Sequence, residues 1–407
     1  MHRTRLMTTL FVAQVCGSTG HSISLAVGSI VAAEITGTNV WSGMPVAIGS
    51  VGTALASWPL ARLMARFGRR PGLALGYGLA VLGALGGMAG VIAGSFLVML
   101  AGMALFGIAN TSNLLARYAA ADITPVSTRG RAMGLIVWGS TAGSIIGPNL
   151  MSLAVAGGAR LDLSPSASAF LISVAGYALA MLLVQIFLRP DPLHIAREMQ
   201  ARVTADRVPV AAREFWTIAR EPRVRVALGA LTLGQFVMIA TTSTSPLYLH
   251  DQGHAVGVIG IAVSMHLAGM YVASPLSGWL SDRFGRMPVI VAGALGLIGA
   301  VLLAGFVPGQ HGALVIFGLF LNGIGWNMSF VAGSALLTDA LAPTERASVQ
   351  GLADLALGMS GALGSTLGGM VLGTLGFTVL NAASAVLVVG SLFALRLGRR
   401  PARLTTA

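Results

Sequence analysis

Three side chains that can gain or lose a proton lie inside long apolar stretches of the chain: Asp354, His21 and His266. A carboxyl group taken out of water binds a proton more readily, and histidine changes charge near neutral pH. Each of the three is therefore a candidate for carrying protons through an apolar medium. A structural alternative stays open for all of them. Asp354 can satisfy the N-terminal field of its own helix or bond to the preceding apolar stretch, and each histidine can be a hydrogen-bonding group of the core.

Amide and aromatic side chains form a second group of candidates, because polar groups are costly in hydrocarbon and usually face a cavity or a partner. They are Gln14, His21, Asn110, Asn113, Gln235, Asn322, Trp326 and Asn327. Gln14 and His21 share one face of a helix by their spacing, as do Asn110 and Asn113. A cavity lined by such groups suits a neutral or weakly charged organic molecule with a flat apolar part. The alternative for each amide is hydrogen bonding between helices.

No residue pattern typical of an enzyme accompanies these candidates. The sequence has no glycine-rich phosphate loop, no cluster with metal-ligand spacing and no nucleophile next to a base. We therefore expect no catalysis, no metal and no cofactor. Cys16 is the single cysteine, which excludes a disulfide framework.

Membrane helices are the elements that must position these side chains. Charged residues make up 9% of the 407 residues, against roughly 25% in soluble domains, and the mean hydropathy is +0.82. A run of about 20 apolar residues crosses the hydrocarbon core of a bilayer. Twelve spans are predicted, at residues 8–33, 42–64, 72–94, 96–117, 131–156, 167–188, 225–248, 256–280, 288–307, 312–337, 348–373 and 376–396.

The basic residues predict how these spans are oriented. The net charge is +12, and all 25 basic residues are arginines. All except Arg160 lie in the two tails or near connections that follow an even-numbered span, which argues for a topology signal and against nucleic-acid binding. Both termini are thus predicted to be cytoplasmic, in a multi-pass protein of the inner membrane. The polar linker 189–224 is predicted to join a first six-helix bundle, 1–188, to a second, 225–407, that ends in a short basic tail.

Landmarks of the first half recur in the second half at one constant offset. Residues 66–71 return as 283–288, and the same offset joins Asp122 to Asp339. A membrane chain whose landmarks repeat at about half its length is predicted to be a duplicated helix bundle, which is one way in which secondary transporters are built.

These features together resemble the major facilitator superfamily over the whole chain. The loop motif of that family is Gly-x-Leu-x-Asp-Arg-x-Gly-Arg-Arg. Its first nine positions are present at residues 278–286, while in 61–70 Ala61 and Ala65 replace its Gly and Asp. The resemblance implies an all-α integral membrane fold of two pseudo-symmetric six-helix bundles. It implies a monomer that moves a small molecule, coupled to protons, by alternating access. The first, fourth, seventh and tenth spans would line the central cavity.

The resemblance also implies a gate at the cytoplasmic ends of the helices. We expect Asp122 to pair with Arg66, and Asp339 with Arg283, in contacts that form in one conformation and break in the other. Because Ala65 replaces an acid, Asp282 is expected to carry more of the gating. The alternative is that these arginines only fix the topology. The expected gate residues are Arg66, Gly68, Arg69, Asp122, Asp282, Arg283, Gly285, Arg286 and Asp339.

The fifth span bears on the direction of transport. Gly143, Gly147 and Pro148 resemble the antiporter motif of drug exporters, in which a proline with flanking glycines bends the helix. However, Met103 stands where such exporters usually carry an arginine. Proton-coupled export of a small organic compound is the predicted function, and proton-coupled import of a metabolite or vitamin is the alternative. A membrane sensor that kept the fold but lost transport is the alternative from another class.

Overall fold

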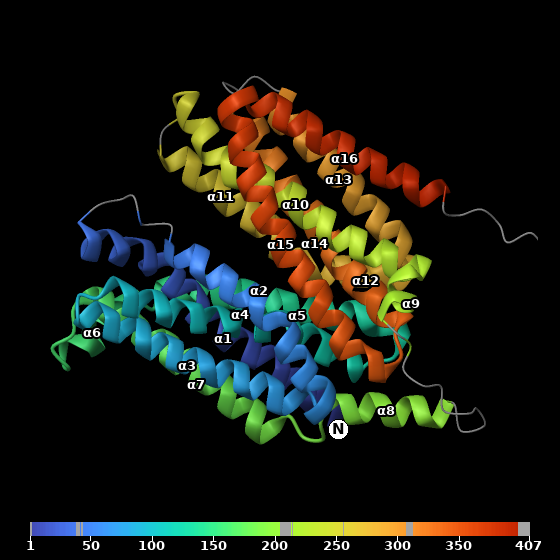
Figure 1. Cartoon of the computed structure of the whole chain (residues 1–407), viewed down its shortest axis with the longest axis horizontal. Helices are drawn as coiled ribbons and strands as arrows, with labels where there is room; N and C mark the ends of the chain where they lie inside the picture. Colours follow the sequence, from blue (N-terminus) through green and yellow to red (C-terminus); the bar gives the residue numbers. More distant parts are fainter. Residues whose placement is uncertain are drawn as a thin grey trace, which may run out of the picture. The chain divides into compact units, whose positions relative to one another are not determined.

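The computed structural model describes residues 2–37, 41, 44–203, 213, 215–254, 256–306 and 312–397, and its regular elements in these ranges are helices (Figure 1). In chain order they are α1 (His2–Thr36), α2 (Met44–Phe67), α3 (Arg69–Ile92), α4 (Phe96–Asp122), the 3₁₀ helix η2 (Val126–Thr128), α5 (Arg129–Asn149), α6 (Met151–Ala159), α7 (Pro165–Phe187), α8 (Pro192–Val203), α9 (Phe215–Arg220), α10 (Pro222–Asp251), α11 (Val256–Tyr271), α12 (Ser274–Phe284), α13 (Arg286–Phe306), α14 (Gly312–Ala340), α15 (Pro343–Leu375) and α16 (Phe377–Leu397).

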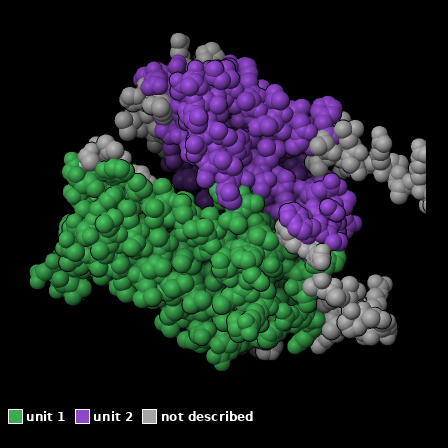
Figure 2. Space-filling view, in the orientation of Figure 1, with its two compact units in different colours: residues 1–213, 341–358 green, residues 214–340, 359–407 purple. Residues whose placement is uncertain are grey.

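The chain divides into two compact units, coloured separately in Figure 2. The first unit contains Met1–Arg213 together with Leu341–Gly358, so it includes the first turns of α15. The second unit contains Glu214–Ala340 and Met359–Ala407. Helix α15 therefore contributes residues to both units, although it is one continuous helix.

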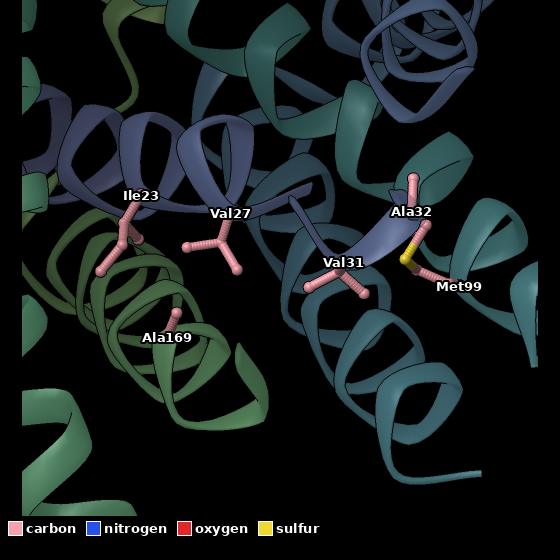
Figure 3. Packing of buried hydrophobic residues seen from close by; sticks show 6 residues of the cluster. All are labelled: Ile23, Val27, Val31, Ala32, Met99 and Ala169. Atoms are coloured by element: carbon pink, nitrogen blue, oxygen red, sulfur yellow. The ribbon is translucent and has the colours of Figure 1, made fainter. Parts of the chain in front are cut away.

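Close helix contacts build the core of the first unit. A Cβ added to Gly102 of α4 would lie 2.3 Å from the backbone nitrogen of Gly87 in α3, so a larger residue would force these two helices apart. Apolar side chains fill the space between α1, α4 and α7, in a buried cluster formed by Ile23, Val27, Val31, Ala32, Met99 and Ala169 (Figure 3).

In the second unit, α13 and α14 also approach each other closely at a glycine. A Cβ on Gly325 would lie 2.7 Å from the backbone nitrogen of Leu297. Val237 of α10, Leu297 and Val301 of α13 and Val388 of α16 form a buried cluster next to this contact. Small residues at the contact and large apolar residues beside it are the usual solution for packing helices in lipid, where apolar burial supplies no drive to associate.

Seven of the described helices are long and apolar enough to cross a membrane, or up to eight if a bent pair counts as one span. The bent pair corresponds to the predicted span 131–156, whose two parts, Val126–Gly147 and Met151–Ala159, meet at 52°. The predicted span 256–280 is also divided, because α11 ends at Tyr271 and α12 begins at Ser274. Breaks in the helices therefore account for part of the difference from twelve continuous spans.

Candidate functional site

Two of the candidate amides in the first unit are hydrogen-bonded inside the bundle. Gln14 of α1 is buried, and its Nε2 donates to Ser140 Oγ of α5 at 2.8 Å. Asn113 of α4 is also buried, and its Oδ1 accepts from the hydroxyl of Tyr77 at 3.0 Å. The structure thus places both amides in contacts between helices, which is the alternative that the sequence left open for them. Tyr77 was not among the sequence candidates.

His21 and Asn110, by contrast, are half-buried. The ring of His21 stacks on Phe106 with 5.3 Å between centroids, and its Nδ1 lies 3.5 Å from the hydroxyl of Tyr177. Gln14 and His21 lie on the same helix as expected, but Gln14 is buried and His21 is half-buried. His21 and Asn110 are therefore the better candidates in this unit for contact with a bound molecule.

A group of four side chains in the second unit combines an amide with aromatic rings; we call Gln235, Tyr271, Trp326 and Phe330 the aromatic cluster. Trp326 Nε1 donates to Gln235 Oε1 at 2.7 Å, which joins α14 to α10. The Trp326 ring stacks on Phe330 with centroids 4.7 Å apart and meets Tyr271 edge-on at 6.3 Å. The hydrogen bond fixes the indole ring, and offset-stacked or edge-on rings are the preferred aromatic geometries. Trp326 and Phe330 are buried, whereas Gln235 and Tyr271 are half-buried, so the accessible part of the cluster is an amide beside a ring.

Two other candidates in the second unit are buried in the helix packing. Asn327 donates to Met270 O at 2.6 Å and to Ser274 Oγ at 2.7 Å, and so braces the break between α11 and α12. His266 Nδ1 lies 3.0 Å from Leu319 O, and its Nε2 lies 3.3 Å from Thr242 Oγ1. A carbonyl only accepts, so Nδ1 carries the proton and Nε2 of the neutral ring accepts from the threonine.

Asn322 differs from these two residues. It is fully buried, and neither of its amide atoms bonds to a described residue. A buried amide without partners is costly, so this position is a candidate for a polar ligand or a trapped water.

Asp122, one of the expected gate residues, pairs with two arginines inside the first unit. Arg69 Nε lies 2.9 Å from Asp122 Oδ2, and Arg346 Nη1 of α15 lies 3.2 Å from Asp122 Oδ1. The expected partner, Arg66, is exposed in this structure, and its guanidinium lies 5.1 Å from the centre of the Phe67 ring. Arg69 Nη2 also donates to Gln350 of α15 at 2.6 Å, and neither Gln350 nor Arg346 was among the sequence candidates.

Asp191 holds the loop that carries Arg69. Its carboxylate accepts from the backbone nitrogens of Arg69 and Arg70 at 3.0 and 2.8 Å, at the start of α3, and from Leu193 at 2.8 Å near the start of α8. Gly68 is necessary here, because its φ is 105° and a Cβ would lie 2.4 Å from the Asp191 carboxylate. Asp191 therefore caps two helices, and a cap of this kind typically contributes about 1 kcal/mol.

In the second unit, Arg286 occupies the position that corresponds to Arg69. Its Nε lies 3.0 Å from Asp339, and its Nη1 lies 2.5 Å from Asp282. Arg283, the expected partner of Asp339, is exposed, and in this structure Asp339 pairs with Arg286. Gly285 again has a positive φ, of 92°. The first half has Ala65 in place of Asp282. The Nη1 atom of Arg69, which corresponds to the donor that meets Asp282, lies 4.0 Å from Met64 Sδ, and Nη2 donates to Gln350.

Asp354 forms a buried ion pair that the sequence did not predict. Arg117 Nη2 of α4 lies 2.5 Å from Asp354 Oδ1, and both side chains are at most 1% exposed. Arg117 ends the predicted span 96–117, and in the structure it lies inside α4, which continues to Asp122. Asp354 Oδ2 has no hydrogen-bond partner among the described residues. The one available signal was the acid itself, because the repeat has Val137 at the corresponding position.

The glycines of the fifth span lie against α1. A Cβ on Gly143 would lie 2.5 Å from Val15 O and 2.6 Å from Ser18 Cβ, and one on Gly147 would lie 2.6 Å from Thr19 O. Gly147 ends the first part of the bent pair, where the helix changes direction by 52°. Pro148 follows at this bend, but its side chain lies outside the described residues.

Replacing Gly143 by valine is expected to destabilise the protein by roughly 1–3 kcal/mol, because overpacking forces α5 away from α1. The measurement is thermal unfolding of the purified protein in detergent. Gly157 of α6 is the matched control, because a Cβ there meets nothing within 4 Å. Equal melting temperatures for Gly143→Val and Gly157→Val would contradict the close contact.

Comparison with known proteins identifies the family. The model of the Major Facilitator Superfamily matches residues 10–257 and 248–407. An uncharacterized MFS-type transporter of Bacillus subtilis strain 168, YddS, is 31% identical over 94% of this chain and 88% of its own length. The riboflavin transporter RfnT of Brucella anthropi is 27% identical over 93% of this chain and 91% of its own.

A solved structure gives the same fold. The human organic anion transporter MFSD10 superposes with a TM-score of 0.75 at 18% identity, over 97% of this chain and all of its own. The same family is indicated by three observations: the long apolar helices, the repeated landmarks and these matches. The chain therefore belongs to the major facilitator superfamily and is a multi-pass membrane transporter with the twelve-helix fold of that family.

Proposed function

We propose that this protein is a proton-coupled secondary transporter of the inner membrane that exports a small organic compound by alternating access. Its two six-helix bundles, 1–188 and 225–407, would move about the linker 189–224. Both termini would lie in the cytoplasm, and the protein would act as a monomer. The observation that carries proton coupling is the buried pair of Arg117 and Asp354. Protonation of Asp354 removes the charge that balances Arg117. The ion pair that joins the first turns of α15 to α4 is then lost.

The aromatic cluster supports a substrate with a flat apolar part. Trp326 is buried between Gln235 and two further rings and holds them in place, so a planar molecule could contact the half-buried Tyr271 ring and bond to the Gln235 amide. The half-buried His21 and Asn110 supply polar contacts in the first unit. The similarity to a riboflavin transporter agrees with this substrate class, because riboflavin is a flat heteroaromatic compound with polar edges.

Export is supported by the bend that follows Gly147 and by the close contact of Gly143 with α1. Both features match the motif that accompanies export in this family. Import of a vitamin or related metabolite is the second candidate. It is favoured by the similarity to the riboflavin transporter along 93% of this chain, and by Met103 in place of the arginine of drug exporters.

Everted membrane vesicles loaded with a pH-reporting dye test the function directly. After energisation, a panel of flat heteroaromatic compounds, vitamins, dyes and drugs is added; a substrate is expected to collapse the proton gradient only when the protein is present. Trp326→Ala is expected to raise the apparent KM by about tenfold or more, because it removes the indole donor that orients Gln235 and the ring that supports Tyr271.

Trp279→Ala is the matched control, since Trp279 is 40% exposed on α12 and lies outside the aromatic cluster. Accumulation of a compound by intact cells, with no collapse of the gradient in everted vesicles, would overturn export and support the importer. A loss that is equal for Trp326→Ala and Trp279→Ala would overturn the substrate-binding role of the aromatic cluster.

A further inference from the structure

A cavity of about 510 Å³ lies within the second unit, between α10, α13, α14 and α16 (helices labelled in Figure 1). Its walls are mostly apolar, and they include Val226, Leu233, Ile290, Leu297, Leu336 and Val388. None of the residues of the aromatic cluster lines it. The volume is within the usual range of ligand pockets, about 300–1,000 Å³. The cavity is thus separate from the candidate substrate site and large enough for an organic ligand.

The cavity extends along α10 from Pro222 to Gly234. Twelve residues of helix correspond to about 18 Å, and one leaflet contributes about half of the roughly 30 Å hydrocarbon core. The lining from the other helices comes from the start of α13 and from the ends of α14 and α16. All four ends belong to the arginine-rich face that the positive-inside rule assigns to the cytoplasm. The cavity therefore has the length of a lipid chain in the cytoplasmic leaflet.

Two arginines stand at the end of the cavity where α10 begins. Arg223 and Arg225 line it, both are exposed, and neither guanidinium pairs with a carboxylate among the residues that the structure describes. The N-terminus of α10 adds a partial positive charge, and its first turn contains no acidic residue. The nearest acid along the chain, Glu221, is half-buried. This end of the cavity is therefore positively charged, whereas its walls are apolar.

We propose that this cavity binds an anionic phospholipid of the cytoplasmic leaflet. One acyl chain would lie along α10, where Gly229 leaves open space because a Cβ there would meet nothing within 4 Å. The phosphate would lie against Arg223 and Arg225, since basic pockets between membrane helices on the cytoplasmic side recognise lipid headgroups by charge. The chemistry selects for a negative headgroup joined to a long apolar chain, and both parts are needed.

Thermal unfolding of the purified full-length protein in detergent, titrated with phosphatidylglycerol, tests the proposal. Phosphatidylglycerol is expected to raise the melting temperature, and phosphatidylcholine with the same chains to have a much smaller effect. Arg223→Gln combined with Arg225→Gln is expected to weaken the apparent affinity roughly 30-fold, because each arginine near the headgroup contributes about fivefold. Gly229→Trp, which fills the cavity, is expected to remove the response to lipid.

The matched controls are Arg220→Gln and Gly373→Trp. Arg220 is exposed near the start of α10 without lining the cavity, and Gly373 is an exposed glycine of α15 with no neighbour within 4 Å of its Cβ. Both controls are expected to respond to phosphatidylglycerol as the unchanged protein does. Equal responses to the two lipids, or an unchanged affinity in the exposed arginine variant, would overturn the proposal. A response to glycerol phosphate as large as the response to the lipid would overturn the role of the chain.

Discussion

Asp354→Asn is expected to abolish proton movement driven by substrate, while exchange of substrate across the membrane continues. Asparagine keeps the shape of the side chain but cannot take up and release a proton, so the coupling step is lost without loss of the substrate site. The measurement uses proteoliposomes, in which pH-dye quenching reports proton movement and counterflow of labelled substrate reports exchange. Glu345→Gln is the matched control, because Glu345 is another acid of α15 and pairs with Arg213 at 2.9 Å. A proton signal that persists in Asp354→Asn would contradict the assignment.

The ion pair itself can be checked through stability. Arg117→Met leaves a buried carboxylate without its partner, which costs about 3–5 kcal/mol, whereas replacing both members by apolar residues of similar volume is often neutral or stabilising. Arg117→Met is thus expected to unfold at a clearly lower temperature than Arg117→Met combined with Asp354→Leu. A double variant that is no more stable than the single one would argue against a direct pair.

Asp122→Asn is expected to destabilise the protein far more than Asp339→Asn, although the two positions correspond in the repeat. Asp122 is fully buried between Arg69 and Arg346, so its loss leaves two buried guanidinium groups without their charge partner and costs about 3–5 kcal/mol. Asp339 is 16% exposed, and its partner Arg286 keeps the bond to Asp282, so we expect a loss of about 1 kcal/mol or less. Thermal unfolding of the two variants in one detergent measures the difference. Equal shifts would show that the two halves hold their gates with equal strength.

The comparison of Asp122→Asn with Asp339→Asn also tests which half has the weaker contacts at the expected gate. The sequence suggested that Asp282 carries more of the gating, because Ala65 removes the corresponding acid from the first half. In the structure, Arg69 bonds instead to Gln350 of α15. A large effect of Asp122→Asn would therefore show that these charged contacts contribute more stability in the first half than in the second, although Ala65 replaces the loop acid there.

The sequence was sufficient for the family and the general positions of the helices, because long apolar runs and a repeated loop motif are local signals. It was not sufficient for the gate partners. Arg66 and Arg69 are both arginines of one loop, and only the turn at Gly68, with its φ of 105°, directs Arg69 inward and leaves Arg66 exposed. The repeat did contain the information, since Arg69 and Arg286 occupy equivalent positions and make equivalent contacts with Asp122 and Asp339.

Contacts between residues far apart in the chain could not be predicted from the sequence for another reason. Arg117 and Asp354 are far apart in the chain and follow no pattern of spacing, so nothing local marks them as partners. Asn113, Gln14 and His266 were recognised as polar groups in apolar helices, but only the positions of Tyr77, Ser140 and Leu319 reveal that the packing uses them.

Helix α15 has a mechanical consequence for the proposed coupling. Asp354 lies before the boundary at Gly358 where α15 passes from the first unit to the second, and Gly361, whose added Cβ would lie 3.2 Å from Gln235 Nε2, lies beyond it. The two positions are separated by about 10 Å of one helix. A helix transmits a tilt as a rigid rod does, but glycines lower its stiffness, and here Gly358, Gly361 and Gly364 follow one another within two turns. In the proposed cycle, the stiffness of this short section would decide how tightly proton movement is coupled to substrate movement, and a more flexible section would let protons cross without substrate.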